Sequence, residues 1–401
     1  MISAKLVKRG LLSAVVGSAL ALTAACGGSS SASTTSGGKH AAAPERSAAK
    51  ITVQPGAGAK GVDTSGAVKL AVASGKFTKV AVTAPDGTAV PGALSADKAS
   101  WTPSGTLRTA TKYTVSATAV DAKGLAASTS TSFTTLKPSR TNVAYFNINP
   151  NQTYGVGIEV SLNFKYPVDD ESKVGKAITV TASNGVPVVG HWFNDQRLDF
   201  RPENYWQPGT KGTLHLRLDG VKTSSGTYGQ QYKDVSFSIG RSQVSVADDH
   251  TKTVKVYRGG KLIRTLPASL GAPGHTTYNG KMVIMEQDRT VNMDSRTVGL
   301  GNAYNIPDVP HAQRLTPSGT FIHGNYWRPL SVFGSEDTSH GCVGLHDVQG
   351  GGDPSTPAAW FYNSSLIGDV VQVVHSPDKT VAPDNGWNGW NMSWSEWTSG
   401  S

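Results

Sequence analysis

The chain has 401 residues and a net charge of +9, and charged residues make up only 16% of it. This length predicts two to four domains, and sparse charge with abundant glycine and small polar residues is usual for an exported protein. The lysines and arginines do not form long runs, which argues against a nucleic-acid-binding protein.

Residues 1–26 have the pattern of an export signal. A short basic segment precedes an apolar run from Leu11 to Ala25, which is too short to cross a membrane comfortably. The run ends at Cys26, and this ending resembles a bacterial lipoprotein signal, although Thr23 stands where that pattern prefers Leu. The resemblance implies a lipid on Cys26 that anchors the protein to the cell membrane, facing the extracytoplasmic space and the cell wall. Ordinary cleavage, giving a soluble secreted protein, is the alternative.

Residues 27–50 are mostly Gly, Ser, Ala and Thr. Such a segment has too few apolar residues to bury a core, so it predicts a flexible linker.

Residues 51–241 show the pattern of an all-β region. Short alternating apolar and polar runs, such as Val68–Val72, Thr78–Val82 and Tyr113–Ala117, are separated by turn residues. This spacing predicts β-sandwiches.

An internal repeat divides this region. Five residues recur 99 positions later in the chain: Trp101, Pro103, Thr111, Lys112 and Thr114 reappear as Phe200, Pro202, Thr210, Lys211 and Thr213. We therefore predict two tandem Ig-like domains, 51–138 and 139–241.

Residues 242–376 predict a third, β-rich domain with short helices. The glycine pair Gly259-Gly260 predicts a tight hairpin turn between two strands. Thr356-Pro357 predicts the cap and first residue of a short helix. Further strands are expected at Met282–Met285, Thr320–His323 and Val370–Val374.

The third domain contains the sequence Ser339-His340-Gly341-Cys342, and His323 lies 19 residues before the cysteine. Cys342 has no partner for a disulfide once the signal is removed, so it is either a buried small residue or a reactive thiol. A thiol is mostly protonated at neutral pH, so a nearby imidazole favours the reactive interpretation.

These residues resemble the L,D-transpeptidases of bacterial cell walls, which have a YkuD-type catalytic domain. The family pattern is a His, a gap, and then Ser/Thr-His-Gly-Cys, which matches His323 and Ser339 to Cys342. The glycine run Gly155-Val156-Gly157 resembles the second Ig-like domain of the lipoprotein type, although Glu159 replaces a proline of the usual pattern. The fold implied is mostly β: two tandem Ig-like β-sandwiches followed by the catalytic domain.

The resemblance implies acyl transfer between peptidoglycan tetrapeptide stems, which serve as donor and acceptor. Cys342 attacks the carbonyl of the third residue of a stem, the terminal D-Ala leaves, and a thioester remains. The side-chain amine of a second stem then attacks the thioester and forms a 3→3 cross-link. Carbapenem-type β-lactams are expected to acylate the same thiol.

The resemblance also assigns roles in catalysis. His323 is the base, and the Gly324 carbonyl fixes its ring; the usual family residue there is Ser. His340 supports the site. The backbone N–H groups of Gly341 and Cys342, with the hydroxyl of Tyr304 on a mobile lid at about 295–320, stabilise the oxyanion.

Substrate binding is expected at six positions: Met293, Tyr304, Ser318, Gly319, Ser339 and Gly344. At Gly344 the family often has an Asn that contacts the donor. No cofactor and no metal are implied. A zinc site built from Cys342 and nearby histidines (His311, His323, His340 and His346) is the less favoured alternative, since these residues lack a short paired ligand motif.

Other functions remain open on the same fold. An L,D-carboxypeptidase would use water as the acceptor, and an attachment enzyme would join a protein to peptidoglycan. A catalytically silent wall-binding lipoprotein is the alternative of a different class. The protein is expected to act as a monomer.

Residues 377–401 contain four tryptophans. We expect this tail to fold back onto the catalytic domain or the second Ig-like domain, because tryptophan usually contributes buried apolar area. An aromatic sugar-binding surface is the alternative.

Overall fold

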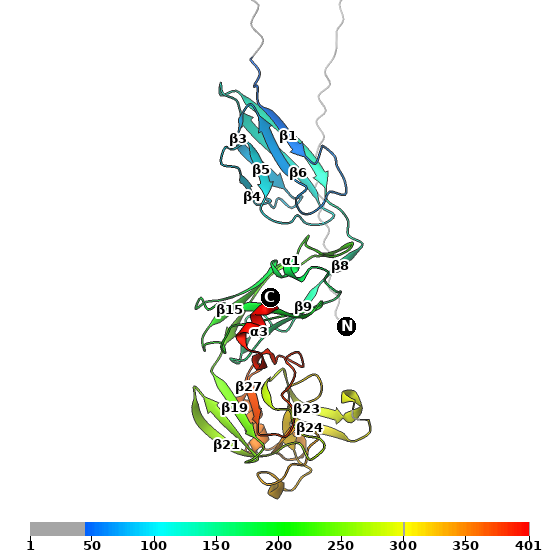
Figure 1. Cartoon of the computed structure of the whole chain (residues 1–401), viewed down its shortest axis with the longest axis vertical. Helices are drawn as coiled ribbons and strands as arrows, with labels where there is room; N and C mark the ends of the chain where they lie inside the picture. Colours follow the sequence, from blue (N-terminus) through cyan, green and yellow to red (C-terminus); the bar gives the residue numbers. More distant parts are fainter. Residues whose placement is uncertain (1–44, 300, 401) are drawn as a thin grey trace, which may run out of the picture. The chain divides into compact units, whose positions relative to one another are not determined.

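The computed structural model describes residues 45–299 and 301–400. The export signal, the lipidation candidate Cys26 and most of the predicted linker lie outside the described residues. The described chain is mostly β, with two sandwich domains followed by a third domain (Figure 1), as the sequence predicts. None of its helices has the length and apolarity that a membrane crossing requires.

The first sandwich has a four-stranded and a three-stranded sheet. Their strands, in spatial order, are β1 (Lys50–Gln54), β2 (Lys69–Ala73), β5 (Ser100–Pro103) and β4 (Gly92–Leu94), and then β3 (Lys76–Thr83), β6 (Lys112–Val120) and β7 (Ala126–Thr134). The domain begins earlier than residue 51. Ser47 donates a hydrogen bond to the Leu125 carbonyl (2.7 Å), and Ala49 is buried in the core. The end of the predicted linker therefore belongs to the folded domain.

The second sandwich has two four-stranded sheets and a small third sheet. One large sheet consists of β10 (Thr153–Tyr154), β18 (Tyr232–Ile239), β15 (Lys211–Arg217) and β12 (Ile178–Ala182). The other consists of β13 (Val189–Asn194), β14 (Arg197–Arg201), β11 (Val160–Phe164) and β9 (Ala144–Phe146). The small sheet contains β16 (Lys222–Ser224), β17 (Thr227–Gly229) and β8 (Arg140–Asn142), and the helix α1 covers Glu171–Gly175.

The sequence repeat corresponds to equivalent strands of the two sandwiches. β6 pairs with β7 so that Tyr113 lies opposite Phe133, and β15 pairs with β18 so that Gly212 lies opposite Phe237. A Cβ on Gly212 would lie 2.2 Å from the Phe237 ring. In the first copy the Tyr113 ring stacks on Phe133. In the second copy the Phe237 ring lies over the backbone of Gly212, which leaves no room for a side chain there.

The third domain is built on a nine-stranded sheet of the described residues. Its spatial order is β22 (Gly280–Val283), β27 (Val370–Val374), β19 (Gln243–Asp248), β20 (Thr253–Arg258), β21 (Lys261–Ser269), β26 (Val343–His346), β25 (Phe321–Asn325), β24 (Asn305–Arg314) and β23 (Glu286–Asp294). Short helices connect or cover these strands: η1 (Ser295–Val298), η2 (Leu330–Val332), η3 (Gln349–Gly351), α2 (Pro357–Ser364) and η4 (Gly389–Asn391). The last helix, α3 (Trp394–Ser399), lies against β13 of the second sandwich.

Two local predictions in this domain are confirmed. Gly259 and Gly260 have φ values of 53° and 78° in the turn between β20 and β21. Thr356 caps α2 by accepting a hydrogen bond from the Ala359 N–H, and Pro357 is the first helical residue. In both cases a few neighbouring residues determine the structure.

The glycine run of the second sandwich lies directly against the third domain. The N–H groups of Gly155 and Gly157 donate to the carbonyls of Ile367 and Gly368, both at 2.8 Å. A Cβ on Gly155 would lie 2.3 Å from the Asp369 backbone nitrogen. Because only glycine permits this approach, the run is explained by docking of one domain on the other.

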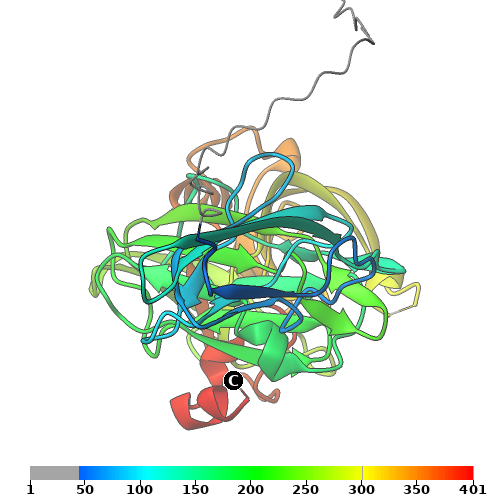
Figure 2. The same cartoon turned by 90° about the horizontal axis from the view of Figure 1, so that it is seen from above.

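The tryptophan-rich tail packs on the second sandwich, which confirms packing as its structural role (Figures 1 and 2, red). The indole nitrogens of Trp390 and Trp397 donate to the carbonyls of Gly157 (2.8 Å) and Val189 (3.0 Å). The Arg201 guanidinium stands over three indole rings of the tail, those of Trp390, Trp394 and Trp397, at 4.4–5.4 Å. The tail therefore fastens the third domain to the second.

Glu159, which departs from the family pattern, is fully buried near Arg201 and Asp199. Neither of its carboxylate oxygens has a hydrogen-bond partner within the described residues, and the Arg201 Nε is likewise unpaired. Burial raises the pKa of Glu159 well above its ordinary value of 4.5, and the nearby Asp199 raises it further. The carboxyl group therefore favours its neutral form.

Trp397→Ala is expected to destabilise the docked unit by about 3–5 kcal/mol, because it leaves a large cavity at a fully buried position. The measurement is the free energy of the first unfolding transition in urea. Tyr145→Ala serves as the control. It removes an aromatic residue that is 60% exposed on the second sandwich, the domain on which Trp397 packs, and little change in the free energy of unfolding is expected. Equal effects of the two substitutions would mean that the tail does not fasten the domains.

Candidate active site

The parallel pairing of β25 with β26 brings the predicted catalytic residues together. The register places Ile322 opposite Val343 and His323 opposite Gly344. Side chains alternate along a strand, so every second residue enters the core: Ile322 from β25, and Val343 and Leu345 from β26. The residues between them face the opposite side. They are Phe321, His323 and Asn325 from β25, Gly344 from β26, and Cys342 directly before β26.

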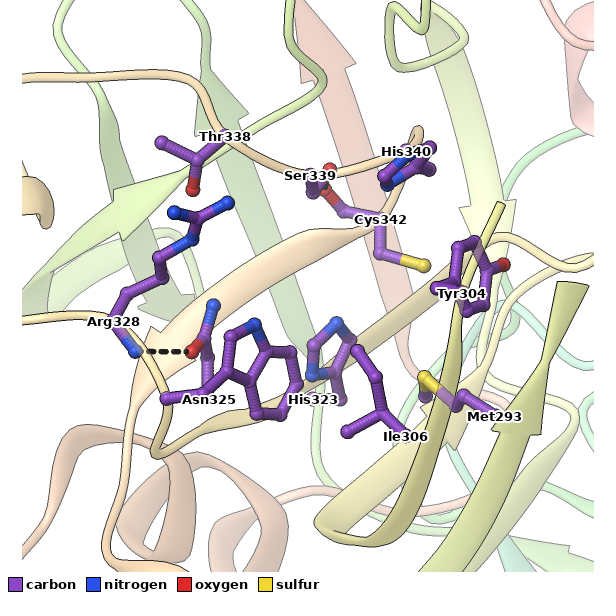
Figure 3. Close-up of a pocket in the computed structure, with 11 residues that line it drawn as sticks. Met293, Tyr304, Ile306, His323, Asn325, Arg328, Thr338, Ser339, His340 and Cys342 are labelled. Atoms are coloured by element: carbon purple, nitrogen blue, oxygen red, sulfur yellow. Dashed lines mark hydrogen bonds between the residues drawn. The ribbon is translucent and has the colours of Figure 1, made fainter. Parts of the chain in front are cut away.

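This face borders a pocket with a cavity volume of about 260 Å³ (Figure 3). His323 and Cys342 lie at its centre, and the lining contains no Asp or Glu. The eleven lining residues are Met293, Tyr304, Ile306, His323, Asn325, Trp327, Arg328, Thr338, Ser339, His340 and Cys342.

The loop before Cys342 is braced by Ser339. The Ser339 hydroxyl donates to the Cys342 carbonyl (2.7 Å) and accepts from the Gly341 N–H (3.1 Å). Gly341 has a φ of 107°, which disfavours any other residue. The motif serine and glycine thus shape the turn that presents the cysteine. The Gly341 N–H already donates to Ser339. It could donate to an oxyanion only by breaking this hydrogen bond or by dividing it between the two acceptors.

The Cys342 thiol is buried and protonated. Burial raises its pKa to about 11, despite smaller opposing effects of the Phe321 N–H and the Arg314 charge. The thiol donates a weak hydrogen bond to the Gly319 carbonyl (3.6 Å). A thiol in this environment needs a base to become a nucleophile at neutral pH.

His323 is held in the orientation that a base requires. Its Nδ1–H donates to the Gly324 carbonyl (2.8 Å), which leaves Nε2 as the acceptor nitrogen. Its ring stacks on Trp327 with centroids 5.8 Å apart. Burial lowers the pKa of His323 below 6.5, so the imidazole is neutral at physiological pH. A neutral imidazole is able to take the proton of the thiol.

Gly324, which stands where the family usually has Ser, lies against Asp347. A Cβ at this position would lie 2.2 Å from the Asp347 Oδ2. Asp347 is itself fixed by hydrogen bonds from His311 (2.7 Å) and Thr356 (3.0 Å). The space of the missing side chain is therefore filled, and the carbonyl that holds His323 stays in place.

His340 lies at the exposed rim of the pocket, between the rings of His275 (4.6 Å) and Tyr304 (5.0 Å). Its ring makes no hydrogen bond within the described residues, in contrast to His323. Partial burial lowers its pKa, and the charges of His275 and Arg328 lower it further. This position suits a supporting residue better than the principal base.

The lid is more ordered than its composition predicts. Residues 305–314 form strand β24, which pairs with β23, so the irregular parts of the predicted lid are the tip of this hairpin and residues 315–320. At the tip the buried Ser295 hydroxyl donates to the Tyr304 carbonyl (2.8 Å) and accepts its N–H (3.1 Å). Figure 3 shows the Cys342 sulfur directed toward the Tyr304 ring. The Tyr304 hydroxyl makes no hydrogen bond in the described part of the chain.

The other predicted substrate-binding residues lie in three different places. Met293 and Ser339 line the pocket. Ser318 lies outside the lining and exchanges hydrogen bonds with Asn385 of the tail (2.8 and 3.3 Å), whereas Gly319 contacts the thiol through its carbonyl. Gly344 lies beneath Asn325, whose amide nitrogen is 3.5 Å from the position of a Cβ on the glycine.

Sequence reasoning missed five lining residues: Ile306, Asn325, Trp327, Arg328 and Thr338. Asn325 carried a usable signal, because it lies two residues after His323, where the predicted strand Thr320–His323 ended, and the strand β25 continues to it. Trp327, Arg328 and Thr338 lie on loops, where no periodicity applies, and Ile306 lies on β24, a strand that the sequence did not predict. Within 45–299 and 301–400, no three His, Cys, Asp or Glu side chains are grouped closely enough to hold a metal ion.

The two parts of the chain match two families. The pattern of the family described as bacterial Ig domain matches residues 59–222, and that of the L,D-transpeptidase catalytic domain matches residues 242–373. The fold and the pocket thus define an L,D-transpeptidase catalytic domain preceded by Ig domains.

Relatives of this kind extend over most of the chain. L,D-transpeptidase 2 of Mycobacterium tuberculosis is 31% identical over 356 residues, which cover 88% of this chain and 85% of the relative. L,D-transpeptidase 5 of the same species is 29% identical over 361 residues, covering 88% and 77%. A solved LD transpeptidase in complex with imipenem is 28% identical and covers 59% of this chain and 100% of its own, with a TM-score of 0.49. The chain belongs to the L,D-transpeptidase family.

His323→Ala is expected to slow acylation of Cys342 by a carbapenem about 10²–10⁴-fold, since it removes the base from a thiol with a high pKa. His340→Ala is expected to slow it less than about tenfold, because the rim histidine does not orient the thiol. The rate is followed by intact-protein mass spectrometry. Equal losses in the two variants would contradict the assignment of His323 as the base.

The acylation rate is expected to stay level at neutral pH and to fall only below pH 6.5. The pKa of His323 is lowered, so the base is lost by protonation only on the acidic side of its ordinary value. The measurement is a pH profile of the rate with one carbapenem. An acid limb centred above 6.5 would contradict a neutral pair and point to a thiolate with an imidazolium.

Proposed function

We propose that this protein is a peptidoglycan L,D-transpeptidase that forms 3→3 cross-links between tetrapeptide stems through a thioester on Cys342. The observation that carries the proposal is the placement of His323 and Cys342 on one face of paired strands, inside one pocket. Family membership supports the reaction class, and the chemistry of a protonated thiol beside a neutral imidazole supports the mechanism.

In the first half-reaction, His323 Nε2 takes the thiol proton as the sulfur attacks the carbonyl carbon of the third stem residue. The carbonyl oxygen becomes an oxyanion, for which the Cys342 N–H and the Tyr304 hydroxyl are the candidate donors. The carbon–nitrogen bond then breaks. His323 returns its proton to the departing nitrogen, so D-Ala leaves with a neutral amine and a thioester remains.

In the second half-reaction, the side-chain amine of an acceptor stem attacks the thioester. His323 takes a proton from that amine, and the sulfur leaves and recovers the proton. The enzyme returns to its starting state with one amide bond broken and one formed, so no cofactor or outside energy source is required. We include carbapenem-type β-lactams among the electrophiles that acylate Cys342.

We also propose export, a lipid on Cys26 and a monomeric enzyme that acts on the cell wall from the outer face of the cell membrane. The basis for export and lipidation is the signal-like sequence of residues 1–26. Lipidation is tested by metabolic labelling with a fatty acid in the wild type and in Cys26→Ser. Loss of label in the variant supports the anchor, and equal absence of label argues for ordinary cleavage.

The test of the enzymatic proposal is incubation of the 46–401 fragment with disaccharide-tetrapeptide, followed by mass spectrometry of the products. We expect a dimer that has lost one D-Ala, and no dimer with Cys342→Ala. Tripeptide without dimer would assign the protein as a carboxypeptidase. If no product forms and the carbapenem leaves the protein mass unchanged, the enzymatic assignment is wrong and a binding role is favoured.

A further inference from the structure

Two polar side chains of the pocket are not used by the proposed reaction. Asn325 is buried, with 4% of its surface exposed, and its Oδ1 accepts the Arg328 N–H (3.2 Å). Its amide nitrogen makes no hydrogen bond within the described residues and borders the pocket. The Arg328 guanidinium also borders the pocket, and no described carboxylate forms an ion pair with it.

These groups gather on one side of the pocket. Figure 3 shows the Asn325 amide nitrogen directed toward the Arg328 guanidinium, which lies beside the Thr338 hydroxyl. Tyr304 lies on the other side of the sulfur, so the catalytic pair separates the lid from this cluster. We call the three residues Asn325, Arg328 and Thr338 the polar wall.

The amide of the polar wall borders the backbone of Gly344 on the neighbouring strand. Gly344 lies opposite His323 on the paired strand, and its missing side chain leaves room that the Asn325 amide borders at 3.5 Å. The position where the family often carries an amide therefore carries none. A neighbouring strand supplies an amide from a different direction.

The charge of the polar wall selects the ligand. The pocket lining includes one guanidinium and no carboxylate, so an anion bound there would not be repelled by a negative side chain of the lining. A planar carboxylate matches the fork of a guanidinium, and its second oxygen is able to accept from an amide or a hydroxyl. A protonated amine would be repelled at this wall.

We propose that Asn325, Arg328 and Thr338 form a carboxylate-binding subsite for the donor stem. The inference rests on the proposed function and deepens it, because it makes the charge state of the donor a determinant of specificity. A donor offers two candidate carboxylates near the reacting carbonyl: the terminal one on D-Ala and the side-chain one on a third-residue diamino diacid. The same chemistry would recognise either.

The test compares kcat/KM for D-Ala release from three donors. One donor has both carboxylates free, one has its side-chain carboxylate amidated, and one ends in D-alaninamide (for which release of D-alaninamide is measured). Wild-type protein is expected to lose about ten- to a hundredfold on one amidated donor, which identifies the bound carboxylate. Arg328→Ala is expected to show that loss on the free donor and to react equally with both forms.

Two variants serve as controls. Arg328→Lys keeps the charge without the fork and is expected to recover part of the discrimination between donors. Lys261→Ala removes an equal charge from the tip of the β20–β21 hairpin and is expected to behave as wild type. Equal slowing of all donors by Arg328→Ala, or no slowing of any, would overturn the subsite.

Failure of the subsite is distinguishable from failure of the proposed function. If the wild type releases product but Arg328→Ala slows all three donors equally, or slows none of them, only the subsite is wrong. If the wild type releases nothing, binding of the three donors to Cys342→Ala is measured by calorimetry. Tighter binding of the free donor that depends on Arg328 supports the subsite, and equal affinities or no binding overturn it.

Discussion

The active site depends on the parallel pairing of β25 with β26. Ile322, Val343 and Leu345 enter the core of the third domain, and this burial fixes the facing of every neighbour along the two strands. A shift of one residue in either strand would turn its apolar residues outward and its reactive residue inward. The register that places Cys342 beside His323 is therefore maintained by hydrophobic burial.

Three departures from the family pattern lie near side chains from other segments. Asp347 fills the space beside Gly324, and Asn325 borders the space beside Gly344. Glu159, which replaces a proline, lies in the same buried region as Arg201. At Gly324 and Gly344 the neighbouring side chain comes from another segment, and both residues of the catalytic pair still line the pocket.

Sequence patterns predicted what a few adjacent residues determine. The turn at Gly259-Gly260, the cap at Thr356 and the motif around Cys342 are of this kind, and so is the class of the fold. The strand β24 within the lid was missed, since its pairing with β23 depends on a partner rather than on composition. Arg328 was missed because it follows a strand, where no alternation indicates which way a side chain faces. Contacts between domains, such as those of Gly155, are invisible until both surfaces are known.

The order of the strands has a consequence for chains that end early. The first strand of the third domain, β19, is flanked on one side by β27. Val244 therefore has no pairing partner on that side until Val370 has been synthesised. The second domain likewise binds Trp397, which comes after the whole third domain in the sequence, in its buried face. A ribosome that stops early would therefore release a chain with an open strand edge and a vacant apolar surface, which are features that proteases and chaperones bind. The third domain and the buried face of the second therefore become stable only after β27 and the tail segment with Trp397 are present.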